Sequence, residues 1–157
     1  MEFHGIPLHP LVVHAAVVFT PLAALAALVF VLVARWRELL RWPAAVLVVV
    51  AAGSCWAARI TGRNLFAKLT AQGLHNKWLN IHQQRANVLV WLVLGLAVVV
   101  VLAALTMPAG DRLARLQVSP VLVLGLQVAV VAVAVASLVY VYLTGDAGAR
   151  SLWAPTS

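Results

Sequence analysis

Four long runs of apolar residues alternate with short polar segments along the chain, and this pattern decides the fold class. A helix that crosses a bilayer needs about 20 consecutive, mostly apolar residues. The four runs lie at about residues 11–34, 43–61, 84–107 and 120–143. We therefore predict an all-α integral membrane protein, a four-helix bundle that forms one transmembrane domain over residues 1–157.

The polar segments predict where the helices begin and end. Pro43 and Pro120 open two of the runs, and proline is tolerated in the first turn of a helix. Thr61-Gly62 and Thr144-Gly145 close the second and fourth runs, and glycine after a last helical turn is a common helix stop. Short segments join runs one to two and three to four. The simplest fold is two antiparallel hairpins in one bundle, with both termini on the same side.

Composition and charge support a membrane environment. The chain is 64% hydrophobic and only 10% charged, which is too apolar for a soluble domain. A net charge of +7 would suggest nucleic acid as the partner of a soluble protein. Here the basic residues cluster between the apolar runs, as charges do that orient helices and contact anionic headgroups. We expect the lipid bilayer as partner and no nucleic acid, and a homodimer stays open.

Several kinds of site are excluded by residues that the chain lacks. Cys55 is the single cysteine, so neither an intrachain disulfide nor a multi-cysteine zinc or iron–sulfur site can form. Only four residues are acidic, which argues against a di-iron carboxylate centre and against proton pumping through buried carboxylates. No residue set indicates a stand-alone enzyme.

The five histidines gather at one end of the predicted bundle. His4, His9 and His14 precede or open the first run, and His75 and His82 lie between the second and third runs or at the start of the third. With four spans, all five positions share one membrane face. A histidine at a membrane interface is often just a polar group among hydrated headgroups. Five on one face and none on the other form the strongest functional signal in the chain.

The two predicted hairpins also resemble each other. Each begins near a histidine, His14 or His82, and each returns at a Thr-Gly pair. This indicates a weak two-fold repeat about the membrane normal, comparable to parallel repeats in transporters. Such an axis would bring His14 and His82 to opposite walls of one cleft.

Two facing histidines are the ligands that a haem needs. Neutral imidazole binds iron, copper and zinc, and one histidine from each of two helices at matched depth suits six-coordinate haem b. We predict a small b-type cytochrome, an electron-transfer module with His14 and His82 as axial ligands. Four basic residues are predicted to receive the haem propionates, because cationic side chains bind carboxylates: Arg59, Arg63, Lys77 and Arg85.

Other ligands and other functions remain open at this point. His75 and then His9 are the next candidate ligands. A second hypothesis is a copper- or zinc-binding membrane protein that uses three or more histidines. A third is a structural subunit of a respiratory membrane complex, without a cofactor.

Several motifs resemble one bacterial family of predicted membrane proteins, known as domain of unknown function 2231. They are the opening "GIPLHPLVVHAAVVF", the Thr-Gly pairs, His82 followed by Ala86-Asn87, and the closing "LTGDAGA". The resemblance covers about residues 5–150 and implies four helices with an HP-x-x-V-H opening. Some members look fused to Rieske-type or c-type cytochrome domains, which implies membrane electron transfer and a redox partner of those classes.

The resemblance carries over to three histidines. His9 and His14 match the two histidines of the opening motif, and His82 matches the histidine of the third helix. The chain departs from the pattern at Ala15-Ala16, where many members carry Phe-Pro, and at Asp146, where a histidine is expected. The second departure puts a two-haem site in doubt.

The basic residues around the first run predict its orientation. No lysine or arginine precedes this run, and three arginines follow it within residues 35–41. By the positive-inside rule, the end of the first helix faces the cytoplasm. The termini and the histidine cluster would then be extracytoplasmic in a bacterial cytoplasmic membrane. Basic residues in the segment between runs two and three oppose this orientation.

Overall fold

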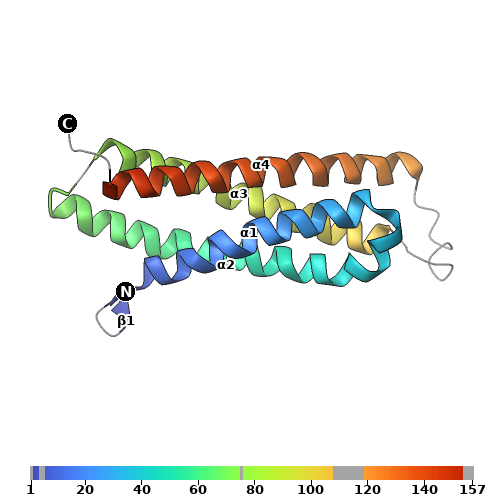
Figure 1. The fold of residues 1–157 in the computed structure, drawn as a ribbon, viewed down its shortest axis with the longest axis horizontal. Helices are drawn as coiled ribbons and strands as arrows, with labels where there is room; N and C mark the ends of the chain where they lie inside the picture. The colour runs from blue at the N-terminus through green and yellow to red at the C-terminus, as the bar shows by residue number, and fades with distance from the viewer. Residues whose placement is uncertain (1, 4–5, 75, 108–118, 154–157) are drawn as a thin grey trace.

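The computed structural model describes residues 2–3, 6–74, 76–107 and 119–153. Four long helices account for most of these residues (Figure 1). A two-residue antiparallel strand pair precedes them, and one short 3₁₀ helix joins the first two. The elements are β1 (Glu2–Phe3), β2 (Ile6–Pro7), α1 (Leu8–Leu32), η1 (Ala34–Trp36), α2 (Arg37–Ala71), α3 (Lys77–Thr106) and α4 (Pro120–Trp153).

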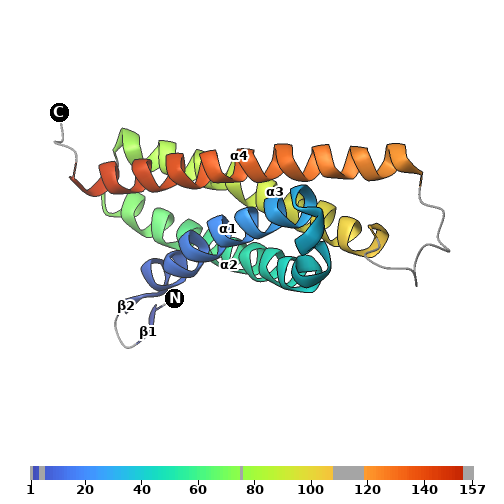
Figure 2. The ribbon, with the colours of Figure 1, turned by 45° about the vertical axis from the view of Figure 1, so that its right-hand side comes forward.

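The helices form one four-helix bundle. Consecutive helices pack against each other and α1 also packs against α4, whereas α1 and α3 scarcely touch and are therefore diagonal. The start of α1, the α2–α3 turn and the end of α4 lie at one end of the bundle, here called the histidine end (Figures 1 and 2). The α1–α2 turn lies at the opposite, far end. The predicted bundle of two antiparallel hairpins is confirmed.

All four helices are long and apolar enough to cross a membrane. Their outer faces expose many large apolar side chains, among them Leu11, Val46, Val98, Leu124 and Val139. Such a surface would drive association in water, but it is the surface that lipid requires. The predicted integral membrane fold is confirmed.

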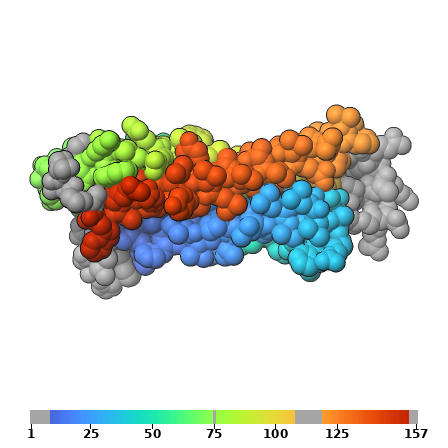
Figure 3. Space-filling model, turned by 45° about the horizontal axis from the view of Figure 1, so that its top comes forward, coloured from blue at the N-terminus to red at the C-terminus, as the bar shows by residue number. Residues whose placement is uncertain are grey.

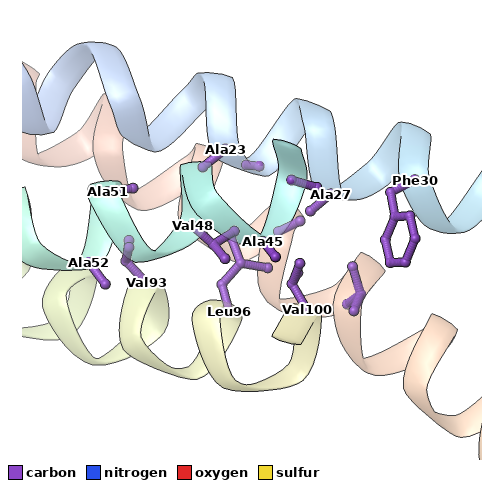
Figure 4. Close-up of a cluster of buried hydrophobic side chains, with 14 of the residues drawn as sticks. Ala23, Ala27, Phe30, Ala45, Val48, Ala51, Ala52, Val93, Leu96 and Val100 are labelled. Carbon is purple, nitrogen blue, oxygen red and sulfur yellow. The ribbon is translucent and has the colours of Figure 1, made fainter. Parts of the chain in front are cut away.

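Small side chains form much of the core. Ala23 and Ala27 of α1 and Ala51 of α2 are fully buried, beside the larger Val48 and Leu96 (Figure 4). Small residues let helix backbones approach closely, which is the main source of helix association in lipid. This packed core occupies the middle of the bundle and the part toward the far end, whereas the histidine end encloses a cavity.

The expected helix stops at the two Thr-Gly pairs are wrong. Helix α2 continues through Thr61-Gly62 to Ala71, and α4 continues through Thr144-Gly145 to Trp153. Glycine inside a helix costs only about 1 kcal/mol relative to alanine, which packing can offset. With 35 residues, α2 is about 52 Å long, much longer than the roughly 30 Å hydrocarbon core.

The start of α2 and the connection to α3 also differ from expectation. Helix α2 begins at Arg37, so Pro43 lies inside the helix. The actual stop is Gly73, whose φ of 74° is the left-handed conformation that glycine adopts readily. The amide of Leu74 donates to the Leu69 carbonyl at 2.9 Å, which completes a Schellman cap. Much of the segment expected as a long connection is therefore helical.

Candidate functional site

A cavity of about 420 Å³ lies at the histidine end and is lined by residues of all four helices. This volume falls in the usual range of ligand sites, roughly 300–1,000 Å³. The lining is mostly apolar, but it includes His9, His14 and His82. The structure therefore brings three of the predicted histidines to one cavity. His4 and His75 lie outside the described residues.

His82 on α3 is held by the backbone of α4. Its Nδ1 lies 2.9 Å from the Thr144 carbonyl oxygen, and because a carbonyl only accepts, Nδ1 carries the hydrogen. A helical carbonyl points toward the residue four positions later, which here is Gly148. A Cβ at Gly148 would lie 3.1 Å from Nδ1 of His82, so the missing side chain gives the ring access to the carbonyl. The neutral ring then keeps a lone pair at Nε2.

His9 on α1 is held by α2 in a similar way. Its Nδ1 lies 3.2 Å from Oγ1 of Thr61. The Thr61 hydroxyl donates its own hydrogen to the Ala57 carbonyl at 3.0 Å, so its oxygen accepts from Nδ1 of His9. The backbone of Ala58, four residues before Gly62, is also within hydrogen-bonding reach of His9. A Cβ at Gly62 would lie 2.8 Å from Cε1 of His9.

The two hairpins therefore repeat one arrangement, in which a histidine of one helix packs against a glycine of the next. His9 of α1 packs against Gly62 of α2, and His82 of α3 packs against Gly148 of α4. The expected two-fold relation named His14 and His82, whereas the matching contacts belong to His9 and His82. These two rings lie close enough that positive charges on both would repel each other. The pairing of His14 with His82 as ligands stays a prediction.

His14 is bound differently from the other two histidines. Its Nδ1 pairs with the Pro10 carbonyl one turn earlier on the same helix. The side chain is exposed and lines the cavity from its outer edge. A neutral ring that donates through Nδ1 leaves Nε2 of His14 as an acceptor as well.

Two arginines give the cavity a positive charge. Arg59 and Arg63 both line it, together with Asn87, and none of the lining residues is acidic. Nε of Arg59 donates to Oδ1 of Asn87 at 2.9 Å. The guanidinium of Arg59 lies over the rings of Trp56 and Trp91, at 5.3 and 5.9 Å from their centroids. These contacts hold a cation at the wall of an apolar cavity, where it attracts an anionic group.

Arg85 contacts α4 instead of the cavity and is not among the lining residues. Its Nη1 donates to the Leu143 carbonyl at 2.8 Å and lies 3.9 Å from Asp146. Asp146 also accepts from Arg150 at 2.8 Å. Of the basic residues predicted to bind propionates, Arg59 and Arg63 line the cavity, whereas Lys77 and Arg85 do not. Arg85 instead joins α3 to α4.

No group of three or more His, Cys, Asp or Glu side chains within the described ranges is arranged to hold a metal ion. Sequence reasoning missed Gly62, Gly148, Thr61 and Asn87 as site residues. The Thr-Gly motifs were noticed but interpreted as helix ends. Gly62 and Gly148 themselves were a possible signal, because glycine is a poor helix former and yet both lie inside helices.

A family model described as predicted membrane protein, DUF2231, matches residues 5–155. The chain belongs to DUF2231. No curated protein and no solved structure matches the chain. Membership of DUF2231 confirms the resemblance and agrees with the four apolar helices, but its description names no activity. Function must therefore be argued from the geometry of the cavity.

Proposed function

We propose that this DUF2231 protein binds one b-type haem in the cavity, with His9 and His82 as axial ligands, and serves as an electron-transfer module. One observation carries the proposal: two imidazoles of one cavity each have Nδ1 bonded to a neighbouring helix. Histidine ligands of metals usually donate their other N–H in this way, which fixes the tautomer and orients the ring. Within the described part of the chain, Nε2 of His82 has no hydrogen-bond partner.

The positions of the two helices support the same conclusion. His9 and His82 belong to α1 and α3, which are diagonal in the bundle, so a planar ligand between them would also contact α2 and α4. Cofactor sites in helical bundles are built in this way, from side chains on facing helices. The small residues Ala16, Ala58 and Ala86 line the cavity and suit a flat apolar ring.

The positive charge of the cavity favours haem over a bare metal ion. Arg59 and Arg63 would hold the two propionates, since guanidinium and carboxylate form strong charge-assisted hydrogen bonds. Arg63 is exposed at the histidine end. A bare copper or zinc cation would be repelled by the same two arginines, and no carboxylate of the lining would offset this repulsion.

When bound, haem supplies reversible one-electron transfer. The chain's own contribution is to hold both imidazoles in one tautomer, to surround the ring with apolar side chains and to place cations near its carboxylates. The redox partner we propose is either a Rieske-type iron–sulfur protein or a c-type cytochrome, as the family resemblance implies. We place the histidine end on the extracytoplasmic side. The connection between α1 and α2, at the far end, carries Arg35, Arg37 and Arg41, and the positive-inside rule assigns such an end to the cytoplasm.

The absorption spectrum tests the haem directly. Full-length protein from haem-replete cells, purified in detergent, should show a low-spin spectrum with split visible bands after reduction with dithionite. Elemental analysis should give about one iron per chain. A colourless protein that takes up no haem, or one with stoichiometric copper or zinc and no iron, would refute the proposal.

Three variants then identify the ligands. His9→Ala and His82→Ala should each abolish the low-spin spectrum, whereas His14→Ala should keep it. Loss of the spectrum in His14→Ala with retention in His9→Ala would restore the pairing predicted from the sequence. Unchanged spectra and assembly in all three variants would instead favour a structural subunit.

The orientation has its own test. Alkaline phosphatase fused after residue 157 should be active, because that enzyme folds only outside the cytoplasm. A fluorescent protein that folds in the cytoplasm should be dark at the same position. The reverse pattern would place the histidine end in the cytoplasm.

A further inference from the structure

We propose that the outer mouth of the cavity, between α1 and α4, binds a membrane-soluble quinol, with His14 accepting a hydrogen bond from a quinol hydroxyl. This inference rests on the proposed function, because a membrane electron-transfer module needs a redox partner that can reach its cavity. It adds a ligand and a residue that the haem site does not use.

The mouth is formed by exposed residues of two neighbouring helices. His14 and Val17 of α1 and Gly145 and Leu152 of α4 all line the cavity and are exposed, Val17 by 48% and Leu152 by 79%. Figure 3 shows α1 and α4 side by side along this face. His14 and Val17 lie within the first apolar run, residues 11–34, so an occupant that reaches the mouth beside them must dissolve in lipid.

The hydrogen bonding of His14 selects the kind of occupant. Its Nδ1 donates to the Pro10 carbonyl, so Nε2 of the neutral ring accepts, and no described residue donates to it. His14 lies five residues along α1 from His9, about 7.5 Å deeper, where a polar atom without a partner is unfavourable. The esters of a phospholipid only accept hydrogen bonds and its donor groups lie in the hydrated headgroup, whereas a quinol carries donor hydroxyls on an apolar ring. The chemistry therefore fits a quinol better than a phospholipid.

The facing wall of the mouth leaves room for the ring. A Cβ built at Gly145 would meet no atom within 4 Å, so this position borders open space. Gly125 lies on the same helix with equally open space, is exposed, and does not line the cavity. The pair supplies a matched test, because Gly145→Leu would fill the mouth and Gly125→Leu would not.

Binding is measured on the full-length, haem-loaded protein in nanodiscs. The probe is decylubiquinol, kept reduced without air, and its oxidised form decylubiquinone is titrated in parallel; binding is followed by calorimetry. Wild type should bind the quinol saturably and at least tenfold more tightly than the quinone. His14→Ala and Gly145→Leu should each weaken quinol binding at least tenfold, with Gly125→Leu unchanged and the haem spectrum retained in all three.

Two results would overturn the quinol site while the haem proposal stands. One is a fully haem-loaded wild type without saturable quinol binding. The other is a set of variants in which His14→Ala and Gly145→Leu bind the quinol as Gly125→Leu does. Equal affinity for quinol and quinone would overturn the acceptor role of His14. A wild type without haem would refute the proposed function instead.

Discussion

The ring of His82 occupies the space that a side chain at Gly148 would fill, with Nδ1 of the ring 3.1 Å from the position of that Cβ. His9 packs against Gly62 in a similar way: a Cβ there would lie 2.8 Å from Cε1 and 3.2 Å from Nδ1 of the ring. Alanine would favour either helix by about 1 kcal/mol over glycine. The two glycines therefore make sense as room for two imidazoles, and they give the site its clearest mutational test.

An added methyl group at either glycine should move a histidine and leave the fold intact. Gly62→Ala and Gly148→Ala would push against the end of a flexible side chain, which can rotate away from the helix. A displaced His9 or His82 would lose the hydrogen bond of its Nδ1. Haem binding should then weaken about 10- to 100-fold, as it does when a group that supports a metal ligand is mutated. Haem titration followed by absorbance measures the change.

Matched controls exist on the same two helices. Gly53→Ala on α2 and Gly125→Ala on α4 add the same methyl group where nothing lies within 4 Å. Both variants should bind haem as the wild type does. If the controls lose haem as strongly as Gly62→Ala and Gly148→Ala, the contacts with the imidazoles are not the cause.

The hydroxyl of Thr61 should set the strength of His9 as a ligand. Thr61→Val keeps the shape but removes the acceptor at 3.2 Å from Nδ1, so the imidazole loses both its orientation and some basicity. We expect haem affinity to fall about tenfold or more and the reduction potential to rise, because a less basic ligand stabilises ferric iron less. Spectroelectrochemistry measures the potential. Thr61→Ser, which keeps the oxygen, should behave like the wild type; equal potentials in all three proteins would contradict the role.

The charge of Arg59 should matter only when the haem carries carboxylates. Arg59→Gln should weaken haem binding about 10- to 100-fold, the equivalent of a charged hydrogen bond of roughly 1.5–3 kcal/mol. Haem dimethyl ester, which lacks the two charges, should bind wild type and Arg59→Gln equally. Arg85→Gln, altered outside the cavity, should lose less affinity for haem than Arg59→Gln. An effect of Arg59→Gln that persists with the ester would point to a structural role.

Asn76 should stabilise the turn between α2 and α3. Its Oδ1 accepts from the Leu79 amide at 2.8 Å, which caps α3, and its Nδ2 donates to the Ser151 carbonyl of α4 at 3.0 Å. Asn76→Ala should cost about 1 kcal/mol for the lost cap and more for the lost contact with α4. Asn76→Asp keeps the cap and should cost less. Thermal unfolding in detergent measures the order, which would be contradicted by equal melting temperatures of the two variants.

Much of the fold follows from the apolar runs alone. In lipid, every backbone hydrogen bond must be satisfied within the chain, so a run of that length can only be a helix. The helix ends were less predictable. Gly62 and Gly73 are both plausible stops by residue type, but only Gly73 has the left-handed conformation, whereas Gly62 lies inside α2 and borders a histidine.

The sequence by itself determined that the chain forms four membrane helices and that His9, His14 and His82 lie at one end of them, because both follow from the number and order of the apolar runs. Only the tertiary structure decided that His9 and His82 rest on glycines, that Arg59 lines the cavity and that Arg85 does not. These facts depend on how each helix is rotated about its axis. That rotation is set by packing against two neighbouring helices at once, which no single run of residues encodes.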